Sequence, residues 1–135
     1  FAENEDPMVA YVYVKYMAAL WIASLARHYP KLRFITMSPG GTTGTKVMDT
    51  LSPFKRVMFK SMFKLMQLSG KAHKLEVGAK RYVDGLRDAS YKSGRFYASR
   101  NGVTGPIIDQ STLFDSLENP AIQDNANEAI HRYLN

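Results

Sequence analysis

The sequence lacks cysteine entirely, which excludes disulfide bonds and thiolate-bound metals. Its three histidines, His28, His73 and His131, are far apart and show no ligand spacing, so we predict no metal site. No apolar run reaches the roughly 18 residues that a bilayer span needs, because Lys15 and Arg27 interrupt or bound the longest candidate. We therefore expect a cytoplasmic protein without a membrane span.

Acidic residues are fewer than basic ones, 12 against 18, which gives a net charge of +6. Such an excess raises the question of nucleic-acid binding. The aromatic residues follow core-like spacing and do not line a basic sheet, so we expect no nucleic-acid partner. With 45% hydrophobic and 22% charged residues in a length of 135, the composition is typical of one globular domain.

Capping and turn signals divide the chain into predicted elements. The pair Asp6-Pro7 is typical of a helix start, and the apolar residues after it predict a helix to about His28. Bulky and β-branched residues predict a short strand over Leu32–Met37. The same signals then predict a helix from Phe54 to about Leu68, a helix with apolar residues at helical spacing from Ala72 to Leu86, a strand over Gly94–Ser99, turns at Asn101-Gly102 and Gly105-Pro106, and a helix from Asn119-Pro120 to near Leu134.

The first predicted helix is apolar around most of its circumference, as in a helix that other elements cover on more than one side. A helix followed by a buried strand is typical of an α/β layer. Two strands alone leave both sheet edges without partners, so we expect further strands upstream. The start at Phe1, followed by an acidic segment, agrees with a piece of a longer protein.

Tyr11 and Lys15 carry the clearest chemistry in the sequence. Their spacing of four places both side chains on one face of the predicted helix, about 5–6 Å apart at Cβ. A phenol alone is a poor acid or base at neutral pH, but a nearby ammonium stabilises the phenolate and eases transfer of its proton. Under the plainer interpretation the pair has a structural role only: the Tyr11 ring packs against apolar neighbours and the Lys15 ammonium extends into solvent. Lys15 is the only charge between Met8 and Ala26, and a buried ammonium needs a partner, which favours a ligand-binding role.

A series of motifs follows this pair. After Tyr11 and Lys15 come a strand to Met37, the pair Pro39-Gly40, and a loop rich in hydroxyl groups that contains Thr42, Thr43 and Thr45. This order and spacing resemble the short-chain dehydrogenases/reductases, in which a helix carries Tyr-x-x-x-Lys and the next strand ends in Pro-Gly with a threonine a few residues on. The resemblance continues through a substrate-covering segment and a final core strand, and covers nearly the whole chain.

The resemblance implies that residues 1–135 form the C-terminal half of a single Rossmann-like domain, a doubly wound parallel sheet with flanking helices. It implies an oxidoreductase that interconverts an alcohol and a carbonyl by hydride transfer, with NAD or NADP as cofactor. The implied partners are a small alcohol or carbonyl substrate of apolar character and further copies of the chain in a homo-oligomer. Tyr11 would be the general acid/base and Lys15 would hold the nicotinamide ribose, while the nicotinamide loop would contain Pro39, Gly40, Gly41, Thr42 and Thr45.

Some parts of the family's site have no counterpart here. Phe1–Ala10 contains no Ser or Thr to match the serine that precedes the family's tyrosine, and no glycine-rich phosphate loop opens a helix. The family's threonine position falls at Gly44 by counting, one residue before Thr45. We expect these residues alone to be inactive and the missing parts to lie upstream. If those parts are absent there too, the alternative is a non-catalytic binding or regulatory protein of the same fold.

A second pattern lies in Lys55–Lys71, where polar residues at helical spacing stand opposite apolar ones. Basic amphipathic helices bind membrane surfaces or calmodulin-type partners. The favoured interpretation is a solvated face over a substrate cover, because adaptable methionines suit a wall that closes over an apolar substrate. The polar stripe contains Arg56, Lys60, Lys64, Gln67 and Lys71, and the opposite face contains Phe54, Val57, Met58, Phe63 and Met66.

Overall fold

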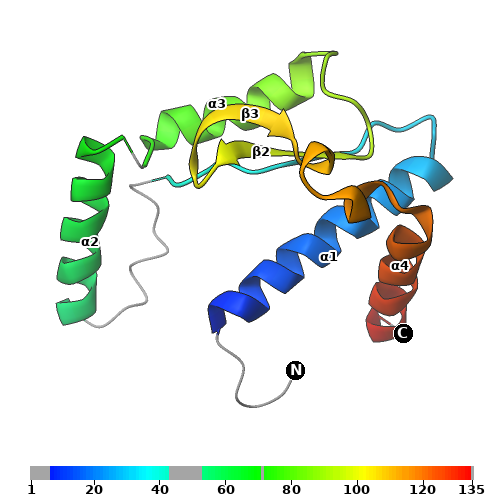
Figure 1. Ribbon diagram of the computed structural model, residues 1–135, viewed down its shortest axis with the longest axis horizontal. Helices are drawn as coiled ribbons and strands as arrows, with labels where there is room; N and C mark the ends of the chain where they lie inside the picture. Colours follow the sequence, from blue (N-terminus) through cyan, green and yellow to red (C-terminus); the bar gives the residue numbers. More distant parts are fainter. Residues whose placement is uncertain (1–6, 43–52, 71, 135) are drawn as a thin grey trace. The chain divides into compact units, whose positions relative to one another are not determined.

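The computed structural model describes residues 7–42, 53–70 and 72–134 (Figure 1). The chain divides into two compact units, which are taken separately below. Unit 1 comprises Phe1–Thr36, Tyr91–Phe96 and Asp109–Asn135, and unit 2 comprises Met37–Ser90 and Tyr97–Ile108. In chain order the elements are α1 (Pro7–His28), β1 (Ile35–Met37), α2 (Pro53–Leu68), α3 (Leu75–Arg87), β2 (Arg95–Asn101), β3 (Thr104–Asp109), the short 3₁₀ helices η2 (Gln110–Thr112) and η3 (Asp115–Glu118), and α4 (Pro120–Leu134).

Within the described residues the sheet has three strands in the order β1-β2-β3, and it is mixed. Only Gly102 and Val103 join β2 to β3, and so short a connection requires antiparallel strands. Gly102 has a φ of 62°, the positive value that the first central position of a type II′ hairpin turn needs. β1 therefore pairs in parallel with β2, and α2 and α3 lie in the connection between them. The predicted α/β class is confirmed, whereas the antiparallel β3 departs from the parallel sheet that the resemblance implies.

The helices predicted from capping signals are confirmed. α1 ends at His28, α2 at Leu68 and α4 at Leu134, each at the predicted residue. The start of α4 shows why the signal worked, because Asn119 Oδ1 accepts hydrogen bonds from the backbone N–H of Ala121 at 3.0 Å and of Ile122 at 3.3 Å. These bonds satisfy two of the amide groups that a helix start leaves without helical partners.

The strands were predicted less well. The first is shorter than predicted, since pairing begins only at Ile35. The predicted turn at Gly105-Pro106 is wrong, because both residues lie within β3. A proline is tolerated there because β3 is an edge strand of the sheet and needs no N–H on its outer side.

The core of unit 1 lies where the second half of α1 packs against α4 and η3. Leu20 and Ala19 of α1 are buried together with Ala126 of α4 and Leu117 of η3. Small side chains at two of these four positions let the helices approach closely. Tyr16, Met17, Phe96 and Ile122 cover the edge of this cluster.

A polar cluster joins the same two helices. Ser24 is fully buried, and its hydroxyl donates to Asp124 Oδ1 at 2.8 Å. Arg27 donates from Nε to Gln123 Oε1 at 2.7 Å and forms an ion pair with Asp124. Gln123 in turn donates from Nε2 to the carbonyl of Leu117 at 2.7 Å. Each buried polar group named here therefore has a partner, as burial requires.

The first half of α1 differs from the prediction of a helix covered on several sides. Val9, Tyr11, Val12, Tyr13 and Val14 are all exposed. The sequence pattern could not separate the two halves because both are equally apolar. Residues 9–28 are long enough and apolar enough to cross a membrane, with a mean hydropathy of 1.5. Of this stretch, 22% is buried. The core helix of a soluble protein can have the same length and composition. The absence of a membrane span and the cytoplasmic location therefore stay predictions.

Helix α3 of unit 2 also differs from the sequence pattern. Its periodic apolar residues Leu75, Tyr82, Val83 and Leu86 are exposed, and the buried positions are Gly78, Arg81 and Gly85. The glycines let α3 approach its neighbours closely: a Cβ built on Gly78 would collide with Thr42 Cγ2, and one on Gly85 would lie 2.9 Å from Met37 Cε. Close approach, and not the apolar period, decides which face of α3 is buried.

The cluster around Asp124 predicts a defined dependence of stability on pH. The hydrogen bond from Ser24, and then that from Arg27, hold the pKa of Asp124 below its ordinary value of 3.8. A carboxylate with a lowered folded-state pKa contributes stability that is complete above pH 3.8 and is lost as the pH falls towards the folded value. We expect the difference in unfolding free energy between the parent and Asp124→Asn to be constant near neutrality and to shrink on acidification below about pH 4.

The measurement is urea unfolding followed by the fluorescence of Trp21, the single tryptophan, which lies in unit 1. Asp115→Asn removes an exposed aspartate of η3 outside the cluster and serves as the control. A difference between parent and Asp124→Asn that stays the same down to about pH 3 would contradict the prediction.

Candidate functional site

Tyr11 and Lys15 lie together on α1 of unit 1, as their spacing predicted. The Nζ atom of Lys15 is 5.4 Å from the centroid of the Tyr11 ring, a distance at which an ammonium is attracted to an aromatic face. Tyr11 is 58% exposed and Lys15 is also exposed. Both the hydroxyl and the ammonium can therefore be reached by a molecule in solution.

The exposure of Lys15 differs from the buried position that its apolar helix predicts. Only a buried ammonium needs a partner to be stable. In the structure water can solvate Lys15, so its position requires no ligand for stability. The evidence for a site is therefore the geometry of the pair, with Lys15 beside the Tyr11 ring.

The predicted nicotinamide loop follows β1, and its residues Pro39–Thr42 lie in unit 2. The N–H of Gly41 donates to the carbonyl of Val103 at 2.7 Å, and the carbonyl of Gly41 accepts from the N–H of His73 at 2.6 Å. Thr42 and His73 form an isolated parallel bridge. The N–H of Gly40 donates to Ser38 Oγ at 3.2 Å. The loop is thus held by hydrogen bonds on both sides, while the predicted Thr45 lies outside the described residues.

Gly40 is a position of this loop at which any side chain would be strained. Its φ is 75°, in the left-handed region that favours glycine. A Cβ on Gly40 would lie 2.5 Å from the carbonyl oxygen of Val103 and 2.7 Å from Arg81 Nη1. The loop therefore packs its backbone directly against the hairpin and the Arg81 side chain.

Arg81 was not predicted, and its side chain bonds to three different segments of unit 2. It comes from the buried face of α3 and is only 5% exposed. Its Nη1 donates to Ser99 Oγ of β2 at 2.9 Å, and its Nη2 donates to the carbonyl of Gly105 in β3 at 3.0 Å. The signal in the sequence that could have identified Arg81 is its position three residues after Gly78 and four before Gly85. The two glycines leave room for close packing on the face of the helix that Arg81 shares with them.

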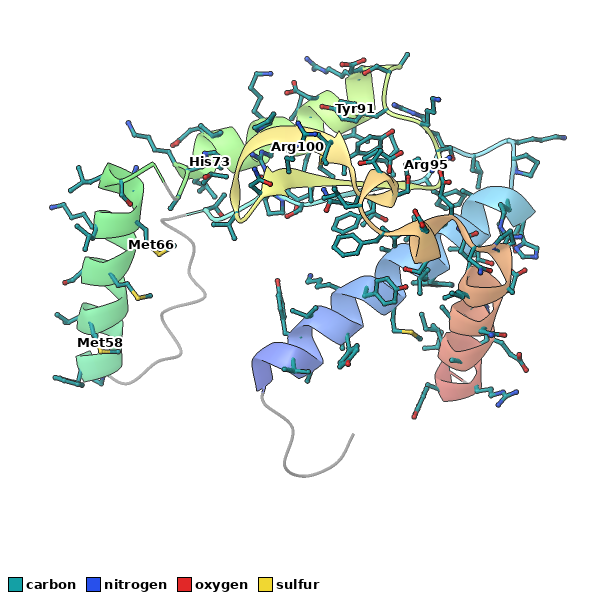
Figure 2. All side chains as sticks on the ribbon, in the orientation of Figure 1. Met58, Met66, His73, Tyr91, Arg95 and Arg100 are labelled. Carbon is teal, nitrogen blue, oxygen red and sulfur yellow. The ribbon has the colours of Figure 1, made fainter. Side chains whose placement is uncertain are left out.

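His73 completes this group, and Figure 2 shows it beside the N-terminal end of α3. Arg81 Nη2 lies 2.9 Å from His73 Nε2. A guanidinium only donates, so Nε2 accepts, and the ring is neutral with its proton on Nδ1. Burial, and then the positive charge of Arg81, lower the pKa of His73 from its ordinary 6.5. The ring is therefore held in its neutral form.

Unit 1 also contains a cavity of about 230 Å³, beside α1 and η3. Its two arginines, Arg27 and Arg95, are both paired with carboxylates: Arg27 with Asp124, and Arg95 with Glu118 and Asp109. The lining contains none of the residues predicted to form the site. Within the part of the chain that the structure describes, no three His, Asp or Glu side chains gather to hold a metal ion.

No protein-family model matches the chain, and no curated protein shows significant sequence similarity to it. The resemblance to the short-chain dehydrogenases/reductases therefore rests on the motifs of this sequence alone.

The close packing at Gly40 predicts a strong effect of a single methyl group. Gly40→Ala and Gly102→Ala both place alanine at a positive φ, which costs about 1–2 kcal/mol. Only Gly40→Ala adds a collision, since no atom lies within 4 Å of a Cβ on Gly102. We expect Gly40→Ala to lose more stability than Gly102→Ala, measured as hydrogen-exchange protection of the Gly41 and His73 amides. Equal losses in the two variants would show that the contact contributes nothing.

His73 predicts a loss of stability on mild acidification. Because its folded-state pKa is below 6.5, the unfolded chain takes up a proton first as the pH falls, so stability declines below that pH and is complete above it. Gln at this position keeps an acceptor for Arg81 but does not titrate. We expect the protection of unit 2 amides to fall as the pH drops below about 6.5 in the parent and to fall less in His73→Gln. Parallel pH profiles in the two proteins would contradict this account.

Proposed function

We propose that this chain is part of an NAD(P)-dependent oxidoreductase of the short-chain type, which interconverts an alcohol and a carbonyl. The observation that carries the proposal is the contact between the Lys15 ammonium and the Tyr11 ring on an accessible face of α1. The motif order after this pair supports it: β1 is followed, after Ser38, by Pro39-Gly40 and a loop whose backbone is closely packed.

In this proposal Tyr11 moves the proton. Its exposed hydroxyl donates to the carbonyl oxygen of the substrate during reduction, and the phenolate takes the proton back during oxidation. The Lys15 ammonium, 5.4 Å from the ring, stabilises the negative charge that Tyr11 carries between these events. Proton transfer from a positioned side chain contributes about 10²- to 10⁴-fold to the rate of such reactions.

A bound nicotinamide cofactor, NAD or NADP, would supply the hydride. Lys15 fits the role of holding its ribose, because an exposed ammonium has donors to offer to ribose hydroxyls. The N–H and carbonyl of Gly41 bond to Val103 and His73 and fix the shape of the loop that would meet the nicotinamide. The expected roles of Pro39, Gly40, Gly41, Thr42 and Thr45 at the nicotinamide stay predictions.

The proposed fold is a Rossmann-like doubly wound sheet, of which β1, β2 and the helices connecting them are one part. The parallel pairing of β1 with β2 across a helical connection supports it, because parallel neighbours need a crossover of this kind. An apolar substrate and a homo-oligomer belong to the same proposal. The exposed apolar residues in the first half of α1 support both, because such surfaces are usually covered by a ligand or another chain.

The decisive test removes the Tyr11 hydroxyl in the full-length protein that contains this chain. We expect Tyr11→Phe to lower kcat/KM for NAD(P)H-dependent carbonyl reduction by about 10²- to 10⁴-fold while cofactor binding is kept. Lys15→Ala should weaken both turnover and cofactor binding, since Lys15 is assigned to both.

Tyr13→Phe is the matched control, because Tyr13 lies on the same helix with 55% exposure against 58% for Tyr11. Undiminished turnover in Tyr11→Phe, or an equal loss in Tyr13→Phe, would refute the assignment. Cofactor binding without any turnover in the parent protein would favour the alternative of a non-catalytic binding or regulatory protein.

A further inference from the structure

The net charge of the chain is concentrated in one segment. Residues 50–75 contain six basic residues and no acidic one, so this segment alone carries +6, the net charge of the whole chain. The acidic and basic residues elsewhere cancel. The six are Lys55, Arg56, Lys60, Lys64, Lys71 and Lys74. A local excess of this kind creates a strong positive potential, which an average over the chain hides.

Helix α2 lies within this segment and presents apolar side chains to solvent. Phe54 is 81% exposed and Leu65 is 68% exposed, and Met58 and Met62 are exposed as well. Their spacing of three and four residues places these four on one continuous stripe of the helix. Met58 and Met66 mark the course of α2 in Figure 2.

The basic residues of α2 form a stripe of their own. Lys60 and Lys64 are both exposed and stand one turn apart, followed by Gln67. The helix has no acidic residue in its first turn or anywhere else in Pro53–Leu68. No carboxylate of α2 can therefore neutralise these two ammonium groups.

We propose that α2 docks on the surface of an anionic lipid bilayer. The apolar stripe enters the boundary between headgroups and acyl chains, and Lys60 and Lys64 reach the anionic headgroups along their flexible stems. A bilayer suits this helix better than a protein that wraps it, because wrapping would bury both lysines, whereas a bilayer leaves them in the hydrated headgroup layer. The inference does not depend on the proposed oxidoreductase activity.

The test is cosedimentation of the full-length protein with lipid vesicles. We expect binding to phosphatidylcholine vesicles with about 30% phosphatidylserine, at least about tenfold weaker binding to pure phosphatidylcholine, and loss of the difference at about 0.5 M salt. Equal binding to both kinds of vesicle, or none to either, would overturn the proposal. So would binding to soluble polyglutamate as tight as to the anionic vesicles, because that result indicates an acidic protein partner.

Paired variants locate the contact. Lys60→Glu with Lys64→Glu should weaken binding to the anionic vesicles at least about tenfold. Lys31→Glu with Lys92→Glu changes the net charge equally at exposed positions of unit 1 and should leave most of the binding intact. Phe54→Ser with Leu65→Ser tests the apolar stripe and should weaken binding without changing charge.

Equal weakening by the unit 1 pair would overturn the proposal, because binding would then follow total charge. Binding that survives both α2 pairs, for instance through the exposed first half of α1, would overturn it as well. All the substituted residues are exposed, and circular dichroism of each variant confirms that its helix content is unchanged. The salt and lipid dependence of the parent protein tests the proposal even if a variant fails to fold.

Discussion

The buried guanidinium of Arg81 is the constraint around which unit 2 is organised. A charge so far from solvent is stable only when its donors are satisfied, and Arg81 meets this condition by bonding to Ser99, Gly105 and His73. These partners come from β2, from β3 and from the turn before α3. Gly40 then fits against the same guanidinium because it has no side chain. The hairpin, α3 and the loop after β1 therefore take their positions from one side chain.

Local chemistry explains which parts of the fold were predictable from the sequence. The helix starts at Pro7 and Asn119-Pro120 depend on neighbouring residues alone, so their signals are reliable. The sequence predicts a turn at Gly105 and Pro106 because both are turn formers, and only the sheet shows that they lie on an edge strand. The sequence also does not predict which face of α3 is buried. Its apolar residues recur on one face, but the glycines let another face pack closely against its neighbours.

The candidate site likewise contains contacts that the sequence predicts and contacts that it does not. Tyr11 and Lys15 are one helical turn apart, so their contact follows from the spacing, and the structure has it. Their solvent exposure does not follow, because it depends on which elements cover the first half of α1. The link between Arg81 and its partners joins residues 18 and 24 positions apart, and no local pattern specifies such a distance. Chemistry within one helical turn is readable from sequence, while contacts between elements are not.

The two edges of the sheet differ in a way that sets how it can be enlarged. β3 forms one edge and contains Pro106, which has no N–H to give to an incoming strand. β1 forms the other edge, is parallel to β2, and contains neither proline nor glycine. Among the strands that the structure describes, an added strand thus meets a complete row of backbone donors and acceptors only at β1. The hairpin ends this sheet on one side, and β1 can pair on the other with a strand from elsewhere in the protein or from another chain.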